Sequence, residues 1–463
     1  MNLTDLFKFK TDELTLVPNQ GGDVKSVDLL TFVDMITFRE SLNQMFIEGS
    51  LTLTVPKGYF SSLNIYLGPS DALKVSIRSF KTLKDDQCED NDVSISDIFI
   101  INKISKVEIT SQIYDKYNIS FISPEGVKDK GQKIQKSFSN VKRSDAIKTL
   151  YDTTLKVNAN LNTNADTDNA DFCCVIPNWS PSKSINWFLS GCYQNDIKNF
   201  YFFQRINKEG KIETVFENYK TLCEKDVSVG RDGELASGYI SSLDSINNQD
   251  YDPDTNYKQK MKFTISEPII YDRDMLQKSM SGVWSSKVHF YDITSKKYTF
   301  KDFNYKDQSP KPLLNRNDRK FVKETDIIQL DETLNSPESS VFLLPKARYR
   351  FSVNESLLGS DKKEDWFQEH ISQKETSIFN AVVIEVPGDS QRSAGETVLF
   401  SNLIRNDYND RENSVGFEQD NEGKEMGAKY LIFQLERTFE FPQGNTQPRC
   451  LNRMILVRDG ITD

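Results

Sequence analysis

The sequence has few of the residues on which catalytic and metal chemistry usually depends. Histidine occurs only at His289 and His370, so a Ser-His-Asp or Cys-His arrangement would have to use one of these two. Neither lies in an H-E-x-x-H or nucleophile-elbow motif, and the sequence has no P-loop and no G-x-G-x-x-G segment. We expect His289 to be a packed strand residue and His370 to be solvated. We also expect no catalytic residue and no cofactor.

Cysteine is sparse and irregularly spaced. The six cysteines are Cys88, Cys173, Cys174, Cys192, Cys223 and Cys450. They are too few for a disulfide framework in a chain of this length, so we expect reduced thiols. A metal site using Cys173, Cys174 and Cys192 is the alternative, but adjacent cysteines lack the C-x-x-C spacing that lets two thiolates wrap one zinc ion. We therefore expect no structural metal.

Long apolar runs and an excess of positive charge are also absent. No segment approaches the roughly eighteen apolar residues of a membrane span, and residues 1–10 carry charged side chains rather than a signal-peptide core. The formal net charge of -10 and the pI near 5.1 argue against an outer surface that grips nucleic acid. These features favour a soluble protein that is made and used in the cytoplasm.

Aromatic residues and alternating patterns are plentiful. The 30 Phe and 18 Tyr disfavour general disorder, and 463 residues predict two to four domains. Apolar residues or glycine alternate with polar residues from position 47 to position 55, as expected of a strand with one face buried and one face exposed to solvent. They are Ile47, Gly49, Leu51, Leu53 and Val55. The pattern recurs at 73–78, 106–109 and 117–121. Residues 1–122 are therefore predicted to form a small antiparallel β-barrel or sandwich.

Within residues 123–250, the repeat of apolar residues changes from every second position, as in a strand, to every 3.6 positions, as in a helix. Apolar residues from Ile147 to Leu155 lie on one helical face after Ser144. A second helix begins with Ser180 as its N-cap and Pro181 in its first position. Trp187 is expected at the edge of its buried stripe. We predict an α/β insert domain here.

Further features of this insert are two strands and two polar segments. Strands at 200–205 and 212–216 flank a turn in which Gly210 supplies the positive φ of a hairpin. The aromatic run of residues 200–203 is expected to form a core and interface strand rather than a ligand platform. Residues 157–171 and 245–258, rich in Asn, Asp and Thr, are expected to be exposed loops.

A second β-rich region closes the sequence. Apolar residues alternate with polar ones at 382–386, 431–435 and 454–456. Gly388 and Gly395 are expected to be turn glycines with positive φ. We predict that residues 376–463 form most of a second β-barrel. Residues 251–305, including a hairpin at 288–303, would supply its first strands, and residues 306–375 would be loops or a return of the insert domain. The fold class is a β-rich α+β protein with two small barrels.

Several segments resemble, in the same order along the chain, the baseplate hub proteins of T-even-type contractile-tailed bacteriophages. The segments are Ile119–Leu155 with its FISPEG, KSFSN and SDAIKTL pieces, IPNWSPSKSINWFL at 176–189, FYFFQR at 200–205, VPGDSQRSAGETVLF at 386–400 and GAKYLIFQLER at 427–437. The segment SGVWSSKVHFYDITSKKYTF at 281–300 is also similar to the hub proteins of marine myophages. Residues 306–375 do not align. The resemblance spans most of the chain.

The resemblance implies a homotrimer in which two barrels per subunit form a pseudo-sixfold ring between a hexameric tail tube and a trimeric spike. Three subunits can offer six similar docking positions only if each contributes two similar domains, and residues 45–122 and 380–457 are the candidates. The implied partners are further copies of this chain, the tail tube protein, the spike or tail lysozyme, baseplate wedge proteins and genomic DNA in the lumen. The implied location is the virion, after assembly in the host cytoplasm. We expect a neutral to negative channel, because each Lys or Arg that neutralised a phosphate would add binding energy and hold the DNA in place.

Two other functions are consistent with the sequence. A tail-associated peptidoglycan hydrolase needs only two carboxylates, but the predicted helical content is low for such a domain. The hub of a related contractile injection machine, such as a type VI secretion spike or a phage-tail-like bacteriocin, is the other. Since the sequence stops at Asp463 soon after its last predicted strand, any spike is expected to be a separate polypeptide.

Overall fold

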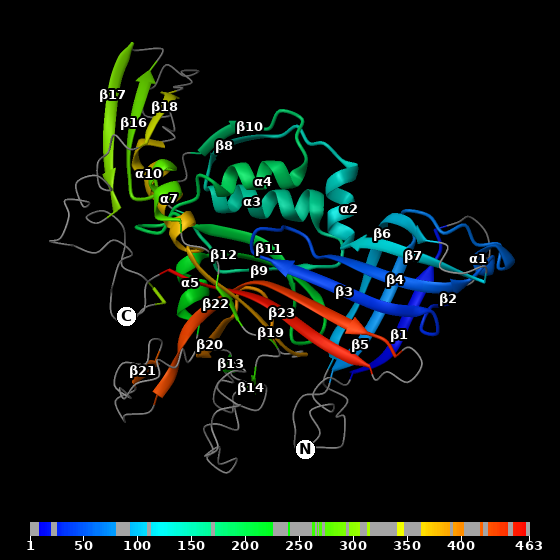
Figure 1. Ribbon diagram of the computed structural model, residues 1–463. Coiled ribbons are helices and arrows are strands. Elements are labelled where there is room, and N and C mark those ends of the chain that lie inside the picture. The colour runs from blue at the N-terminus through cyan, green and yellow to red at the C-terminus, as the bar shows by residue number, and fades with distance from the viewer. Residues whose placement is uncertain are drawn as a thin grey trace.

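The computed structural model describes residues 9–19, 26–79, 93–108, 113–167, 172–225, 239–240, 262–263, 266, 268–270, 274–292, 296–305, 313–314, 340–346, 363–388, 392–401, 417–419, 425–442 and 448–459. These residues form a mostly antiparallel β protein with few helices (Figure 1). One sheet has 15 strands, and three smaller sheets lie beside it. Among the described helices, none is long and apolar enough to cross a membrane.

The first part of the large sheet, which we call the N-terminal half-sheet, has the strand order β2-β1-β5-β6-β7-β4-β3. Its strands are β1 (Phe9–Val17), β2 (Val27–Asp28), β3 (Val33–Ser41), β4 (Glu48–Pro56), β5 (Ala72–Ser79), β6 (Val93–Glu108) and β7 (Tyr114–Ile122), and α1 (Tyr59–Ser62) follows β4. The alternation in β4 buries Leu51 and Leu53, as predicted. The rings of Phe38, Phe99 and Phe121 pack in the core with centroids 5.2 Å apart.

The second part, the C-terminal half-sheet, comes mainly from the end of the chain. Its strands are β13 (Tyr239–Ile240), β14 (Lys262–Phe263), β15 (Ile269–Ile270), β19 (Asn380–Pro387), β20 (Thr397–Ser401), β21 (Phe417–Gln419), β22 (Glu425–Glu440) and β23 (Arg449–Arg458). The strand β22 pairs with β20, β21 and β23, and β23 pairs with β19. Its core is built from alternating apolar residues such as Val382, Ile384 and Leu456. Alternation therefore predicted these strands correctly.

The two half-sheets are joined edge to edge by antiparallel pairing of β3 with β22, which we call the seam. Residues 35–41 pair with residues 434–440, so the strands of both ends of the chain belong to one sheet. The long strand β22 reaches both cores: Leu435 packs in the C-terminal core, and Phe439 packs in the N-terminal core against Phe9 at 5.2 Å. The strand pairs described here do not close either half-sheet into the separate barrel that the sequence predicted.

The insert between the two half-sheets packs around a helical core. Its elements are α2 (Pro124–Gly131), β8 (Ser137–Val141), α3 (Arg143–Leu150), the π-helical turn η2 (Tyr151–Leu155), β9 (Asn160–Thr163), β10 (Phe172–Val175), α4 (Pro181–Leu189), β11 (Phe200–Ile206), β12 (Ile212–Asn218) and α5 (Tyr219–Glu224). The Ser180 hydroxyl accepts a hydrogen bond from the Lys183 amide at 3.3 Å, so the predicted cap of α4 is confirmed. Trp187 lies partly exposed, as expected.

The three-stranded sheet β11-β12-β9 is covered on both faces. Phe200 and Phe202 pack in the core of the insert, whereas Tyr201 and Phe203 pack in a core shared with the C-terminal half-sheet. A sheet covered on both faces needs a continuous apolar run rather than an alternating one, so the predicted core role of residues 200–203 is confirmed. One prediction was wrong here: within the expected loop 157–171, residues 160–163 form β9, because they pair with the apolar strand β12.

A small sheet of order β17-β16-β18 projects from the rest of the molecule (Figure 1). Its strands are β16 (Ser285–Asp292), β17 (Lys297–Asn304) and β18 (Val341–Lys346), and the helices α7 (Met275–Met280) and α10 (Lys363–Thr376) lie at its base. The hairpin 288–303 was expected to begin the second barrel. It instead pairs with β18 in a separate sheet. The expected loop 245–258 lies outside the described residues.

Two of the three turn glycines have the predicted conformation. Gly210 and Gly395 have φ of 77° and 80°. Gly388 is not among the glycines with positive φ, and the expectation for it was wrong. Gly388 is required for space instead, since a Cβ there would lie 2.7 Å from the Cβ of Cys450. The Gly388 amide donates to the Cys450 carbonyl oxygen at 2.8 Å, which holds the two backbones close together.

Candidate functional site

The two histidines occupy structural positions. His289 lies on β16 with its ring stacked on Tyr298 at 5.3 Å, and its Nδ1 contacts the Tyr298 hydroxyl. His370 is not solvated as expected, because α10 packs it against the insert and its Nδ1 lies 2.6 Å from the carbonyl oxygen of Lys198. Burial lowers the pKa of His370, so its neutral form is favoured.

The cysteines of the insert form no site for a metal ion. Cys173 and Cys174 are neighbours on β10, and Cys192 is buried after α4. Burial raises the pKa of Cys174 to about 11 and that of Cys192 to about 12, so both stay protonated at neutral pH. No group of three or more His, Cys, Asp or Glu within the described part of the chain could hold a metal ion. Cys88 lies outside the described residues.

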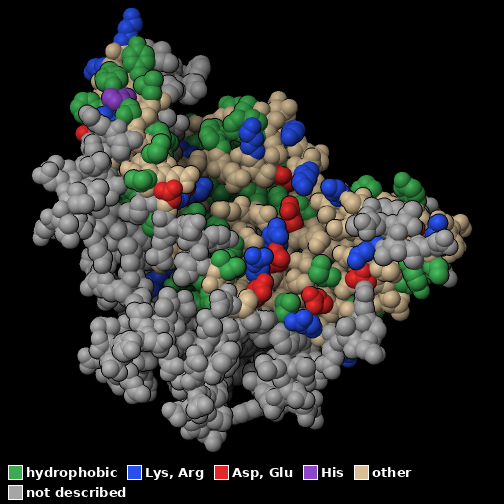
Figure 2. Space-filling model, viewed as in Figure 1, with side chains coloured by type: hydrophobic (Ala, Val, Ile, Leu, Met, Phe, Trp, Pro, Cys, Tyr) green, Lys and Arg blue, Asp and Glu red, His purple; other side chains and the backbone are tan. Residues whose placement is uncertain are grey.

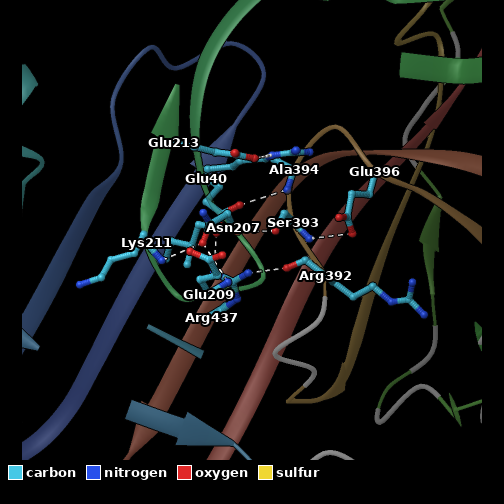
Figure 3. Close-up of polar contacts among 12 residues, drawn as sticks. Glu40, Asn207, Glu209, Lys211, Glu213, Arg392, Ser393, Ala394, Glu396 and Arg437 are labelled. Atoms are coloured by element: carbon cyan, nitrogen blue, oxygen red, sulfur yellow. Dashed lines mark hydrogen bonds and ion pairs between the residues drawn. The ribbon is translucent and has the colours of Figure 1, made fainter. Parts of the chain in front are cut away.

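A buried polar cluster lies on the inner face of the seam (Figure 3). Glu40 of β3 and Arg437 of β22 are both buried, with side chains 1% and 2% exposed, and they form an ion pair. The Glu40 Oε2 atom also accepts the amide proton of Ala394 at 3.1 Å. The Arg437 Nη2 atom donates to the carbonyl oxygen of Arg392.

The same cluster reaches the insert. The Ser393 hydroxyl donates to the carbonyl oxygen of Ile206 at 2.5 Å, and Ile206 ends β11. The amide of Ile206 also hydrogen-bonds to Glu40. Burial raises the pKa of Glu40, while the Arg437 guanidinium opposes that shift. The pair therefore ties β3, β22, the turn at 392–395 and β11 together at one buried point.

The outer face of the seam carries a ladder of alternating charges. The strand registers place five residues directly opposite one another across β19, β23, β22, β3 and β4, in the order Glu385, Arg453, Glu436, Arg39 and Glu48. Arg39 binds Glu436 Oε2 through Nε at 3.0 Å and Nη2 at 2.7 Å. Figure 2 shows charged side chains of both signs close together over the middle of the molecule. Each arginine of this charge ladder thus has a carboxylate on either side.

A row of hydroxyl groups runs beside the charge ladder on the same face. Thr438, Thr37, Ser50 and Ser120 are opposite one another across β22, β3, β4 and β7. The two threonine hydroxyls at the seam lie 3.4 Å apart. The outer face is therefore polar and continuous from one half-sheet into the other, with its cations flanked by anions.

The sequence analysis missed the residues of the seam, although a signal for two of them is present. Glu40 falls in the apolar phase of its strand, after Ile36 and Phe38, and Arg437 falls between Leu435 and Phe439 in the same way. A charge in the buried phase of a strand requires a partner. Alternation in two separate strands does not reveal which partner it has.

Comparison with known proteins gives matches of fold only. No family model matches the sequence, and no curated protein matches it. The 43 kDa tail protein of prophage MuSo2 from Shewanella oneidensis is similar at 9% identity and a TM-score of 0.49, over 97% of this chain and 98% of that one. A chain of the Francisella PdpA–VgrG complex has 12% identity and a TM-score of 0.49, over 100% of this chain and 54% of that one.

A third similar structure is an Escherichia coli protein described as a component of the type VI secretion system with structural similarity to bacteriophage T4 tail proteins. It has 7% identity and a TM-score of 0.42, over 97% of this chain and 76% of that one. With TM-scores of 0.42 to 0.49, these matches leave the function to be argued from the residues of this chain.

Proposed function

We propose that this chain is a structural subunit of the baseplate hub of a contractile phage tail or of a related injection machine. Three copies would form a ring that joins a sixfold tail tube to a threefold spike. The partners would be further copies of the chain, the tail tube protein, the spike or tail lysozyme and wedge proteins of the baseplate. The proposal assigns the chain no catalytic role and no cofactor.

The observation that carries the proposal is the seam. Two β-rich half-sheets from opposite ends of the sequence lie side by side in one sheet, and the buried Glu40–Arg437 pair fixes their relative position. A ring of three such subunits would contain six half-sheets about its axis, which is what a sixfold partner requires. The ordered sequence resemblance described above supports the same assignment.

We further propose that the outer face of the seam lines the channel of this ring. A protein binds DNA phosphates through Lys and Arg side chains whose charge is not already balanced by neighbouring carboxylates. On this face each ladder arginine already lies between two carboxylates, and the charge ladder has one more carboxylate than it has arginines. Such a wall would let DNA pass without holding it.

The purified protein is expected to be a trimer. Its mass in solution, measured by light scattering or native mass spectrometry, should be three times the 53.2 kDa of the chain. A hub must close around its axis before it can present six positions. A stable monomer at assembly concentrations would contradict the proposed function, whereas lytic activity on purified cell walls would favour the hydrolase alternative.

Removing carboxylates from the charge ladder is expected to make the protein bind DNA. The variant Glu48→Gln/Glu436→Gln frees Arg39 from both neighbours, so duplex DNA should be retained at low salt, while the native protein should show no retention. The logarithm of the affinity should fall with the logarithm of salt with a slope of about -0.9 per phosphate engaged. Filter binding over a salt series measures this.

The matched control is Glu13→Gln/Glu209→Gln, which removes the same charge from two exposed positions outside the charge ladder. Equal DNA binding by both variants would mean that only net charge matters. No binding by the ladder variant would reject the channel assignment, and an unchanged trimer mass would show that the hub proposal itself stands.

A further inference from the structure

The projecting sheet β17-β16-β18 and the helices α7 and α10 form a unit that we call the arm (Figure 1). Its own small core consists of Val283, Trp284, Phe303, Tyr305 and Phe379. No apolar cluster of the described residues combines residues 275–305, 340–346 or 363–377 with residues of the insert. The arm is therefore not attached to the insert through a common hydrophobic core.

One side of α10 belongs to the arm. The Phe367 ring packs on Phe342 of β18, with the ring centroids 5.6 Å apart. The next residue, Gln368, donates from Nε2 to the carbonyl oxygen of Ser286 on β16 at 2.9 Å. An ion pair also joins α7 to α10. Because these contacts lie within the arm, we expect α10 to move together with the sheet.

Another side of α10 meets the insert loop 193–199 through hydrogen bonds, and we call this contact the latch. The Gln373 Oε1 atom accepts the Lys198 amide proton at 2.7 Å. The Gln373 Nε2 atom donates to the carbonyl oxygen of Asp196, also at 2.7 Å. The His370 Nδ1 atom lies 2.6 Å from the carbonyl oxygen of Lys198. The latch is thus polar, and two side chains of α10 bind the backbone of the loop.

The backbone leaves the arm at residues 377–380, where two neighbouring residues belong to different cores. Ile378 packs in the core shared by the insert and the C-terminal half-sheet. The Phe379 ring packs on Trp284 of the arm core, with the centroids 5.5 Å apart. A rotation of the arm about this segment would break the latch and leave both cores intact. Residues 377–380 are therefore the natural pivot.

Opening of the latch needs little free energy. Each hydrogen bond of the latch would be exchanged for one to water, so the net loss is small. Separation of an apolar core, in contrast, would expose its whole surface to water. Leu313 and Leu314 also pack at the shared core, but residues 306–312 and 315–339 separate them along the sequence from the described strands of the arm. The latch is the contact that decides the position of the arm.

His370 makes the latch sensitive to pH. A carbonyl oxygen only accepts, so the neutral ring carries its proton on Nδ1 and donates it to Lys198. Burial lowers the pKa of His370 below its ordinary value of 6.5, and the Lys374 ammonium lowers it further, against the opposing effect of the hydrogen bond to Lys198. In an open latch the ring is in water and its pKa returns toward 6.5. The closed latch is therefore fully favoured above pH 6.5 and loses stability as the pH falls below that value.

The charges around His370 do not favour its protonated form. The titratable and charged groups of the loop, of α10, of α7 and of the arm sheet are Tyr193, Asp196, Lys198, Glu369, Lys374, Glu375, Lys278, Lys287, Lys301 and Asp302. Lys198 lies 3.8 Å from Glu369, and Lys278 pairs with Glu375. Both carboxylates of α10 are thus already matched by lysines, and a proton on His370 would add a buried positive charge.

We propose that the arm pivots about residues 377–380, and that the latch holds it while His370 is neutral and releases it when His370 is protonated. The latch is separate from the seam. The proposal goes beyond the hub role and does not depend on it.

Hydrogen–deuterium exchange of the full-length protein at pH 7.5 and pH 5.5 tests the proposal. The Lys198 amide is the reporter, because its acceptor Gln373 lies across the latch. Its protection factor, the ratio of the intrinsic to the observed exchange rate, should fall about five- to tenfold at pH 5.5, where about nine tenths of free histidine side chains are protonated. The amides within α10 and β16 should keep their protection. An unchanged Lys198 amide, or loss of protection throughout the arm, would overturn the proposal.

The two histidines of the sequence provide a variant and its matched control. In His370→Gln, glutamine can still donate to the Lys198 carbonyl oxygen but does not titrate in this range. The protection factor of the Lys198 amide should therefore be the same at both pH values. In His289→Gln, which changes the histidine on β16, the native fall should remain. A fall that persists in His370→Gln, or that disappears in His289→Gln, would show that His370 is not the switch.

A titration of the native protein removes any dependence on how the variants fold. With histidine labelled by carbon-13, the protein gives two ring signals, since its histidines are His289 and His370. The signal of His370 should titrate below pH 6.5 in the folded protein and near pH 6.5 in urea. Titration of His370 at or above pH 6.5 in the folded protein would overturn the proposal.

Discussion

Replacing Arg437 by methionine is expected to lower the free energy of unfolding by about 3–5 kcal/mol, because the Glu40 carboxylate would be left buried without its counter-charge. Methionine matches the length of the arginine stem and keeps its packing. The Glu40 side chain is 1% exposed, so water cannot compensate. Urea unfolding followed by tryptophan fluorescence and circular dichroism measures the change, provided that the two probes agree.

A control for this experiment lies on the same strand pair. Arg39 binds Glu436 on the outer face, where its side chain is 48% exposed. Arg39→Met should cost at most about 1 kcal/mol, because exposed ion pairs contribute little. Losses of similar size for the two variants would contradict the role given to the buried pair.

The double variant Glu40→Gln/Arg437→Met should recover most of the loss. Both charges are then gone, and the glutamine oxygen can still accept the Ala394 amide proton. In the full hub the single variant should also weaken trimer formation, because the angle between the half-sheets would no longer be fixed. A single variant that unfolds more easily but forms normal trimers would confine Glu40 and Arg437 to a role in stability.

Replacing Gly49 by alanine is expected to destabilise the N-terminal half-sheet by about 1–3 kcal/mol or more. Gly49 lies on the inner face of β4 between Phe38 and Phe121, and an added Cβ would overlap with the Phe121 ring and the Thr37 carbonyl oxygen. The ring could move, but the carbonyl belongs to the strand pair itself. Valine at this position should therefore prevent folding of the half-sheet.

Gly131→Ala is the matched control, since a Cβ at this end of α2 would have nothing within 4 Å. It should be neutral or stabilise the protein by up to about 1 kcal/mol. The combination Gly49→Ala/Phe121→Leu should recover only part of the loss, because the overlap with Thr37 remains. Full recovery would show that the ring alone sets the requirement for glycine.

The local parts of the fold could be predicted because each depends on residues close together in the sequence. The alternation from Ile47 to Val55 decides which face of β4 is buried, since successive side chains of a strand point to opposite sides. Ser180 and Pro181 begin α4 because their own backbone and side-chain chemistry suits the first turn. Gly210 allows the hairpin turn because it lacks a Cβ.

The positions of these elements relative to one another were decided only by the tertiary structure. The hairpin 288–303 was predicted as a hairpin but placed in the wrong sheet, because its alternation shows a buried face without showing what covers it. Residues 160–163 were predicted as a loop because they are mostly polar. They form a strand because they pair with β12, which is distant in the sequence. The local pattern of apolar residues decides which face of a strand is buried, but it does not decide which strand lies next to it.

The candidate site shows the same division. The sequence alone determined a β-rich chain with few histidines, no phosphate-binding motif, and a net charge of -10. It also placed Glu40 and Arg437 in the buried phase of their strands. Only the tertiary structure paired these two residues across 397 positions and aligned the charge ladder on the other face. The reason is physical: a buried charge must find a partner, but the partner is set by the pairing of strands that are distant in sequence.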